Sequence, residues 1–427
     1  MRTPRVIATL GTITLATAVL GACGGEDSGS DSGAASGDEN ITLTLATFNE
    51  FGYEDLITEY EAANPNITIE HKKAATATEA RDNINTRLAA GSGLADIEAV
   101  EVDWLSELMQ YPDKFTDLNS AEVEGRWLDW KSAMATTADG KLIGYGTDIG
   151  PEAICYRADL FEAAGLPTDR EEVASAMGST WEDYFALGKK FMASSDVAWM
   201  GSAGEVYNAM VNQMPNAYEQ EDGTVVATSN PEVREAYDMV TQASADGLSA
   251  HLGQWSDDWT SSFQTDGFAT MPCPSWMLGV IEGNASGVEG WDIANTFPGG
   301  GGNWGGSYLT VPTQSEHPEE AKALAAWLTA PEQQIKAFVA KGTFPSQKDA
   351  LSSSELTSVT SAFFADAPTG EIFADRAEAV TVVPFKGPQF SAINDAMQQA
   401  IARVDIDKTD DADASWQKFV SAVESLG

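Results

Sequence analysis

The chain has 427 residues and a formal net charge of −41, from 65 acidic and 24 basic residues. This acidity excludes nucleic acid as an expected partner, because nucleic-acid binding depends on neutralising phosphates with Lys and Arg. It is typical of a solvated surface, and it also favours cationic ligands. The length allows two or more domains of about 100 to 200 residues each.

The N-terminus carries a secretion signal. Two arginines precede an apolar run over residues 6–20, which is shorter than the roughly 20 residues needed to cross a bilayer. Residues 1–22 therefore predict a signal peptide. The run ends in LGAC, which resembles a bacterial lipobox and implies that Cys23 is acylated and anchors the chain to the outer face of the cytoplasmic membrane. Cleavage near Ala22, as in an ordinary secreted protein, is the alternative. Residues 23–40 predict a lipid anchor and a flexible tether, because residues 24–40 contain no large apolar side chain.

Strands and helices alternate from residue 41 onwards. The pattern predicts strands over residues 41–48, 67–70 and 96–102, with helices between them. Such alternation builds a parallel sheet through right-handed crossovers, and ligands bind beyond the carboxyl ends of its strands. The side chains expected at that edge follow the first and third strands: Glu50, Phe51, Glu101, Asp103 and Trp104. Ordinary loop polarity and a surface tryptophan are the alternative.

Residues 146–167, GTDIGPEAICYRADLFEAAGLP, predict a change of chain direction. Turn-forming residues extend to Pro151, residues 153–156 are long enough for a buried strand, and a helical pattern then ends at Gly165. The Gly-Pro pair, the tyrosine five residues later, Asp-Leu-Phe and Ala-Gly-Leu-Pro together resemble the signature segment of extracellular solute-binding proteins. The sugar-binding branch, which includes the maltose-binding protein, is the most similar. In that family the segment carries the chain from one lobe to the other past the ligand cleft.

The resemblance implies an α/β fold of the two-lobed periplasmic-binding-protein type (type II). Each lobe would be a mostly parallel sheet flanked by helices, and several chain crossings would form the hinge. We expect lobe 1 to contain residues 41–149 and 305–352, and lobe 2 to contain residues 150–304 and 353–427. A ligand that touches both lobes would favour the closed state. The family also implies the permease and ATPase of an ABC importer as partners.

Further cleft residues come from the second half of the chain. Residues 255–279 resemble a family segment that ends in a loop with a sugar-stacking tryptophan, and Trp276 takes that position. Residues 299–312 contain G-x-G-x-x-G, but a strand follows it where a nucleotide site requires a helix. We interpret this stretch as a second crossing with Asn303 and Trp304 facing the cleft. The other candidates come from the first crossing, an aligned cleft segment and two loops: Asp148, Glu152, Tyr207, Trp255 and Phe390. The tryptophans assigned to the core are Trp181, Trp199, Trp291, Trp327 and Trp416.

Three cysteines occur in the chain. With Cys23 assigned to the lipid, Cys155 and Cys273 form either a disulfide in an oxidising compartment or two separate buried thiols. The resemblance places both in the sheet of lobe 2, so we predict that they are bridged.

Binding is favoured over catalysis. H-E-x-x-H, G-x-S-x-G and Cys/His clusters are absent from the sequence, so we expect no metal, no cofactor and no enzymatic activity. A pyranose has apolar faces that stack on indole rings and hydroxyls that need hydrogen bonds, which tryptophans beside carboxylates supply. We expect a monomer that binds an oligosaccharide of two or more units, with a β-linked glucose oligomer as the specific guess. The alternatives are a glycoside hydrolase, which needs only two carboxylates about 5 to 10 Å apart, and a polyamine-binding protein.

Overall fold

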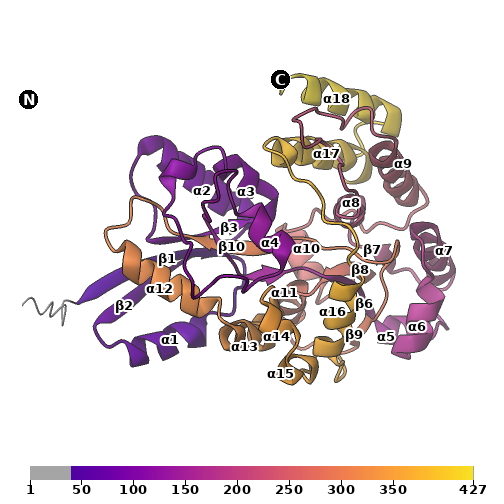
Figure 1. Ribbon diagram of the computed structural model, residues 1–427. Coiled ribbons are helices and arrows are strands. Elements are labelled where there is room, and N and C mark those ends of the chain that lie inside the picture. Colours follow the sequence, from indigo (N-terminus) through magenta and orange to yellow (C-terminus); the bar gives the residue numbers. More distant parts are fainter. Residues whose placement is uncertain (1–39, 427) are drawn as a thin grey trace, which may run out of the picture. The chain divides into compact units, whose positions relative to one another are not determined.

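The computed structural model describes residues 40–426 (Figure 1). The predicted signal peptide, Cys23 with its lipid, and all of the predicted tether except Asn40 lie outside the described residues. Within residues 40–426, no helix is both long enough and apolar enough to span a membrane.

A five-stranded sheet forms the first lobe. Its strands are β1 (Ile41–Phe48), β2 (Ile67–Ala74), β3 (Ile97–Glu101), β4 (Tyr145–Gly146) and β10 (Ser307–Thr310), in the order β2-β1-β3-β10-β4. β1 is parallel to β2 and β3, as the alternation predicts. β10 is antiparallel to β3 and β4. It reaches the sheet from the other lobe with Ser307 opposite Glu101, at the end of β3, and so it must run the opposite way.

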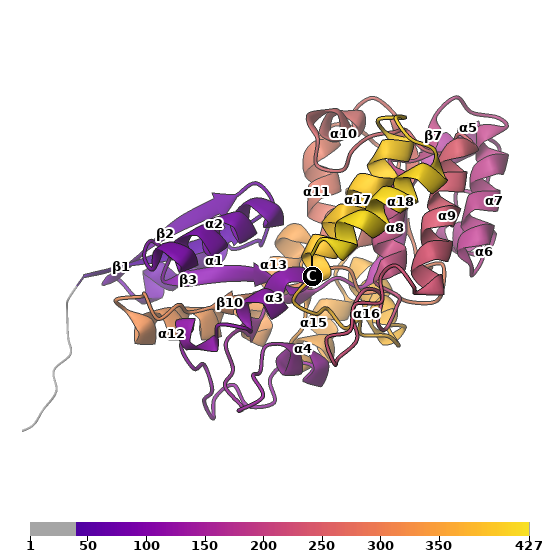
Figure 2. The same cartoon turned by 90° about the horizontal axis from the view of Figure 1, so that it is seen from above.

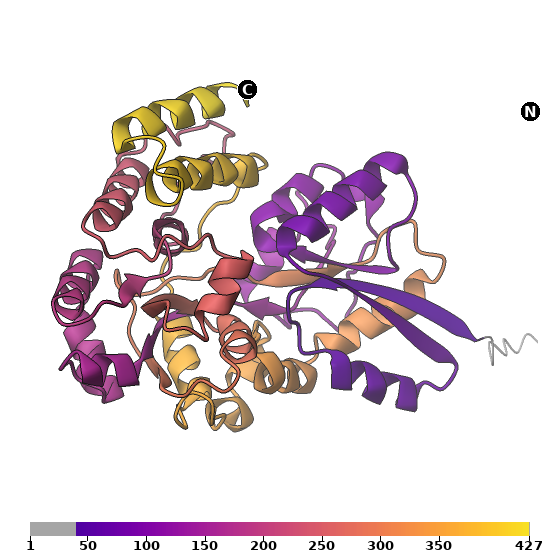
Figure 3. The ribbon, with the colours of Figure 1, turned by 180° about the vertical axis from the view of Figure 1, so that it is seen from behind.

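Helices cover both faces of this first sheet (Figures 1 and 3). Those packed in its core are α1 (Glu54–Ala63), α2 (Ala77–Ala90), α3 (Val102–Leu108) and α12 (Pro318–Leu328), with α4 (Asp129–Met134) and the 3₁₀ helix Pro112–Lys114 nearby. α2 and α3 lie on one face, and α1 and α12 lie on the other. The ring of Tyr60 in α1 packs 5.2 Å from that of Trp327 in α12. α2 begins after Thr76, whose side chain accepts a hydrogen bond from the Glu79 amide, and it ends at Gly91 with φ of +71°.

A four-stranded sheet forms the second lobe. Its strands are β6 (Glu152–Arg157), β7 (Ala198–Met200), β8 (Phe268–Pro274) and β9 (Trp291–Ala294), in the order β7-β8-β6-β9. Only β7 and β8 are parallel, and β6 is antiparallel to both of its neighbours. This differs from the mostly parallel sheet that we expected. The reason is that β6 begins directly after the crossing, with Glu152 opposite Pro274 at the end of β8.

The two faces of β6 supply two separate cores. Ile154 and Tyr156 pack with the helices α5 (Ala158–Ala163), α6 (Arg170–Met177), α7 (Trp181–Met192), α8 (Ala203–Val211), α9 (Pro231–Ala245), α17 (Phe390–Asp405) and α18 (Ala412–Glu424). Ala153 and Cys155 face the other core, which we call the third cluster because the first lobe has a core of its own. The helices that pack in the third cluster are α10 (Asp257–Ser262), α11 (Met277–Asn284), α13 (Pro331–Lys341), α14 (Lys348–Leu351), α15 (Ser354–Thr357) and α16 (Thr369–Glu378). Figure 2 shows α17 and α18 side by side, and their buried side chains share one core. Trp181, Trp199 and Trp416 are buried there, and Trp291 is buried in the third cluster.

Three crossings between the lobes are tied together through their backbones. The Trp304 amide donates to the Gly150 carbonyl at 2.8 Å, and the Gly150 amide donates to the Asn303 side chain at 2.9 Å. A Cβ atom at Gly150 would lie 1.8 Å from the Trp304 carbonyl oxygen, so only glycine fits there. The strands β5 (Asp148–Ile149) and β11 (Phe344–Pro345) pair next to this contact and join the third crossing to the first.

The sulfurs of Cys155 and Cys273 are bonded to each other, with their Cα atoms 5.4 Å apart. The bridge links the central strands β6 and β8 on the side of the third cluster. It closes a segment with a sequence separation of 118 residues.

Replacing both cysteines by alanine should lower the free energy of unfolding by about 2 to 5 kcal/mol, because the unfolded chain then loses its covalent constraint. Urea unfolding of the variant and the wild type measures this difference. Thiol labelling of the denatured, unreduced wild type is the control, and two reactive thiols in residues 40–426 would contradict the bridge.

Candidate functional site

A cavity of about 580 Å³ lies where the first sheet faces the helices of the second lobe. The first lobe contributes the loop after β1 and the starts of α2 and α3. The second lobe contributes α8, the loop 253–255 and one face of α17, and the crossing at residues 304–307 completes the wall. The volume falls within the range of about 300 to 1,000 Å³ that is typical of small-molecule sites. This cavity is therefore the candidate binding site.

Most of the residues that were predicted from the sequence to contact the ligand line this one cavity. They are Glu50, Phe51, Glu101, Asp103, Trp104, Asp148, Trp255, Trp276, Trp304 and Phe390. They come from segments more than 300 residues apart in the chain, so the fold brings the two predicted halves of the site together.

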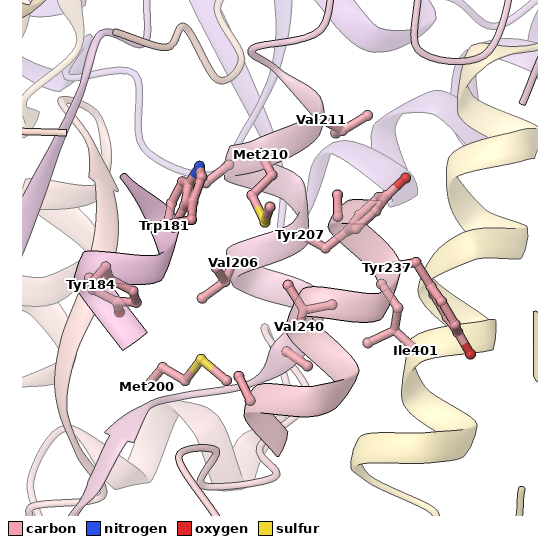
Figure 4. Packing of buried hydrophobic residues seen from close by; sticks show 14 of the residues in the cluster. Trp181, Tyr184, Met200, Val206, Tyr207, Met210, Val211, Tyr237, Val240 and Ile401 are labelled. Atoms are coloured by element: carbon pink, nitrogen blue, oxygen red, sulfur yellow. The ribbon is translucent and has the colours of Figure 1, made fainter. Parts of the chain in front are cut away.

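Three nominated residues do not line the cavity. Tyr207 is fully buried among apolar side chains (Figure 4), and its hydroxyl accepts a hydrogen bond from Tyr218 at 3.0 Å. Asn303 joins the two crossings by accepting from the Gly150 amide at 2.9 Å, and it is held in place by donating to the Gly305 carbonyl at 3.0 Å. Glu152 is fully buried at the start of β6, and its carboxyl oxygens have no hydrogen-bond partner among the described residues. Burial raises the pKa of Glu152 well above its usual range.

Three indole rings form an aromatic wall. Trp255 and Trp276 are stacked with ring centroids 6.1 Å apart and an interplanar angle of 19°, and the ring of Trp304 meets Trp276 edge-on at 5.8 Å. The Trp276 indole nitrogen donates to the Trp304 carbonyl at 2.8 Å, which fixes the orientation of Trp276. Trp255 is 38% exposed and has φ of +71°, a conformation that costs a non-glycine residue about 1 to 3 kcal/mol. The loop thus holds a large apolar surface open to the cavity.

Carboxyl groups line the side of the cavity formed by the first lobe. Glu101 ends β3 and accepts a hydrogen bond from the Asp103 amide at 2.9 Å, which caps α3. Burial and the neighbouring charge of Asp103 raise the pKa of Glu101 to about 8. Asp148 accepts hydrogen bonds from the Ser307 amide at 3.0 Å and the Thr147 hydroxyl at 2.8 Å, while burial raises its pKa. These carboxyls are held in place by backbone groups at the ends of strands.

Asp103 belongs to a set of direct contacts between the lobes. The carboxylate of Asp103 pairs with the Lys386 ammonium group. Nearby, Ser391 donates to the Asp103 carbonyl, and Ser106 donates to the Gly387 carbonyl, both at 2.9 Å. α3 packs in the core of the first lobe and α17 in that of the second, so these contacts join the lobes beside the cavity.

The polar face of α17 was not predicted from the sequence. This face consists of Ser391, Asn394, Asp395, Gln398 and Asp405, with the small Ala402 between them. These residues recur every three or four positions, beside the buried apolar stripe of Phe390, Ile393, Met397 and Ile401. That spacing is the signal that would have identified one helix face turned to the cavity. The Gln398 amide donates to the Asn208 side chain at 2.9 Å and ties this face to α8.

Glu205 in α8 is a second cavity residue that was not among the predicted site residues, although it belongs to residues 205–208, which can be aligned with a cleft-lining segment of the family. It lines the cavity although it is only 1% exposed, and neither carboxyl oxygen has a hydrogen-bond partner within residues 40–426. Burial raises its pKa to about 8. Across the cavity wall, the indole nitrogen of Trp104 also lacks an acceptor in the described chain. Buried polar groups are nearly always satisfied, so these two residues of the cavity wall have hydrogen-bonding capacity that the described chain leaves unused.

Two α/β lobes, joined by paired crossings and enclosing a cavity, define a two-lobed binding protein. A family model described as "Bacterial extracellular solute-binding protein" matches residues 55–367. The chain belongs to that family of bacterial extracellular solute-binding proteins.

Individual relatives agree with this assignment. A crystal structure of an extracellular solute-binding protein of family 1 is 51% identical, with a TM-score of 0.79 over 90% of this chain and 99% of that one. The arabinooligosaccharide-binding protein of Bacillus subtilis (strain 168) is 26% identical over 80% of each chain. The binding protein of B. animalis subsp. lactis Bl-04, solved with β-1,6-galactobiose, shares the fold at 19% identity, with a TM-score of 0.77 over 91% of this chain and 99% of that one.

The raised pKa of Glu205 predicts a specific dependence of stability on pH. Between pH of about 4.5 and about 8 the folded state keeps a proton that the unfolded state has lost, so stability should fall as pH rises. We expect Glu205→Gln to remove this loss, and the stability of the wild type relative to the variant should decrease by up to about 1.4 kcal/mol per pH unit. Urea unfolding from pH 5 to 8 measures it, with the surface change Glu332→Gln as control. Parallel curves for wild type and Glu205→Gln would contradict the assignment.

Because Lys386 takes part in contacts between the lobes, we predict that its side chain favours arrangements in which the lobes touch over more open ones. Lys386→Met removes the pair with Asp103, so the ligand-free protein should populate open states more and show a larger radius of gyration in small-angle X-ray scattering. Lys336→Met, which removes exposed pairs on α13, is the matched control. Identical scattering from wild type and Lys386→Met would show that the pair does not hold the lobes together.

Proposed function

We propose that this protein captures an oligosaccharide outside the cell and delivers it to an ABC importer. One observation carries the proposal: a single cavity offers stacked indole rings on one wall and unsatisfied hydrogen-bonding groups on others. A sugar ring has apolar faces and a rim of hydroxyls, and it needs both kinds of surface once it is buried.

The relatives support the same class of ligand. One relative is an arabinooligosaccharide-binding protein, and another was solved in complex with β-1,6-galactobiose. The cavity volume supports an oligosaccharide of two or more units. Within this class we propose a β-linked glucose oligomer as the specific ligand to test beside arabinosyl and galactosyl compounds.

We further propose that Cys23 is acylated, that the chain acts at the cell surface as a lipid-anchored monomer, and that it hands the sugar unchanged to the permease and ATPase. The sequence LGAC before the tether supports the anchor. Glycoside hydrolysis and polyamine binding are the competing functions, and the first experiment below separates them.

A neutral oligosaccharide should stabilise the mature chain against heat. A ligand that binds only the folded state adds about 2.7 kcal/mol at 100 times its dissociation constant, which raises the melting temperature by several degrees. The screen compares cello-, arabino- and β-galacto-oligosaccharides with spermidine and amino acids. Chromatography of the recovered sugar follows. A response to spermidine alone would replace the sugar assignment, and shortened products would establish a hydrolase.

The open indole of Trp255 should carry much of the affinity. Truncating a central aromatic contact typically costs about 2 kcal/mol or more of binding free energy, so Trp255→Ala should bind the same sugar at least about 30-fold more weakly. Its melting temperature without ligand should change little, because the ring is 38% exposed. Tyr111→Ala is the matched control, since Tyr111 is 57% exposed and does not line the cavity. Equal affinities of Trp255→Ala and wild type, measured by calorimetry, would remove Trp255 from the site.

A further inference from the structure

We infer that the site accepts uncharged sugars and excludes those that carry a carboxylate, such as uronate oligosaccharides. The inference rests on the proposed function and narrows its ligand class. It follows from how the charged side chains around the cavity are already paired.

The cations nearest the cavity are committed to protein carboxylates. Arg81, which lines the cavity, binds the carboxylate of Glu107 at 2.6 Å and 3.1 Å and lies 3.5 Å from that of Asp395. Lys386 contacts Asp103 and donates to the Asn212 side chain at 2.9 Å. Neither has a free charge with which to meet an anionic ligand.

Two lysines near the wall, Lys73 and Lys341, are occupied in the same way. Lys73 and Lys341 approach the Glu50 carboxylate at 2.7 Å and 3.5 Å. Lys131 does not line the cavity: it is 1% exposed, its nitrogen lies 4.0 Å from the centroid of the Tyr308 ring, and that nitrogen has no hydrogen-bond partner among the described residues. Asp148 and Glu101 are the acidic groups that act on it. Within residues 40–426, no cation that lines the cavity lacks a carboxylate partner.

The cavity wall is itself acidic. Seven acidic residues line it against one basic residue, Arg81; the acids are Glu50, Glu101, Asp103, Asp148, Glu205, Asp395 and Asp405. Asp405 is fully buried and its carboxyl oxygens already have partners from the protein: they accept from the Ala203 amide and the Ser244 and Ser249 hydroxyls, and one lies 2.8 Å from Nδ1 of His251. A ligand carboxylate would lose its water without gaining a counter-ion, which is strongly unfavourable.

A neutral sugar matches the groups that remain. A hydroxyl both donates and accepts, so it can donate to Glu205 or accept from the Trp104 indole nitrogen. With its pKa raised to about 8 by burial, Glu205 is mostly protonated at pH 7 and can itself donate or accept. The indole nitrogen of Trp104 supplies one neutral hydrogen-bond donor. A buried ligand carboxylate would need more donors or a positive charge to replace its water.

The test separates charge from size. Cellobiose, β-1,6-galactobiose and arabinotriose are titrated by calorimetry. For each compound that binds, two derivatives are compared. In the first, one primary alcohol is oxidised to a carboxylate; in the second, that carboxylate is replaced by the corresponding neutral amide. The acid and the amide have nearly the same shape.

We expect the acid to bind at least about 100-fold more weakly than the amide. This ratio corresponds to the repulsion between an uncompensated charge and a like charge about 6 Å away at an effective dielectric constant of about 20. An acid within tenfold of its amide overturns the inference while leaving the proposed function in place, whereas failure of every neutral sugar overturns both.

A second variant tests the cause of the exclusion. Asp103→Asn frees the charge of Lys386, so the ratio of acid to amide affinity should rise at least tenfold whatever the change in overall affinity. Lys336→Met is the control, because it alters charge on α13 away from the cavity. An unchanged ratio in Asp103→Asn would show that paired cations do not set the exclusion.

Discussion

The backbone contact between Gly150 and Trp304 is the constraint on which the site depends. It joins two crossings that lie more than 150 residues apart in the chain, and it leaves no room for a side chain at Gly150. The same Trp304 carbonyl accepts the hydrogen bond from the Trp276 indole. The backbone amide and carbonyl of a single residue, Trp304, therefore join the two crossings and orient the aromatic wall.

The ligand-free cavity keeps polar groups that the protein does not satisfy. Glu205 and Trp104 carry buried atoms without partners in the described chain, and such atoms cost about 1 to 3 kcal/mol each. A ligand that supplies these hydrogen bonds regains this free energy only when both lobes surround it. Arg81, the one cation among the described residues that line the cavity, is in contrast paired with protein carboxylates, so the wall offers hydrogen bonds to hydroxyls and no free positive charge.

The sequence predicted those parts of the fold that depend on local order. Glu101, Asp103 and Trp104 follow a buried strand, and a parallel arrangement alone places them at the edge where ligands bind. The antiparallel direction of β6 and β10 was not predictable in this way, because it depends on where the chain re-enters each sheet. Tyr207 and Glu205 show the same limit within one helix. They are two residues apart in α8, and only the packing of its neighbours decides that Glu205 meets the cavity while Tyr207 enters the core.

The central claim is that an oligosaccharide is held between the aromatic wall and the polar faces of α8 and α17. A crystal structure of the mature chain with a bound oligosaccharide tests it most directly. We expect one sugar ring to stack on Trp255 or Trp276, with hydroxyl oxygens within hydrogen-bond distance of Glu205 and of side chains on α17. A sugar bound elsewhere, with this cavity filled only by water, would contradict the account.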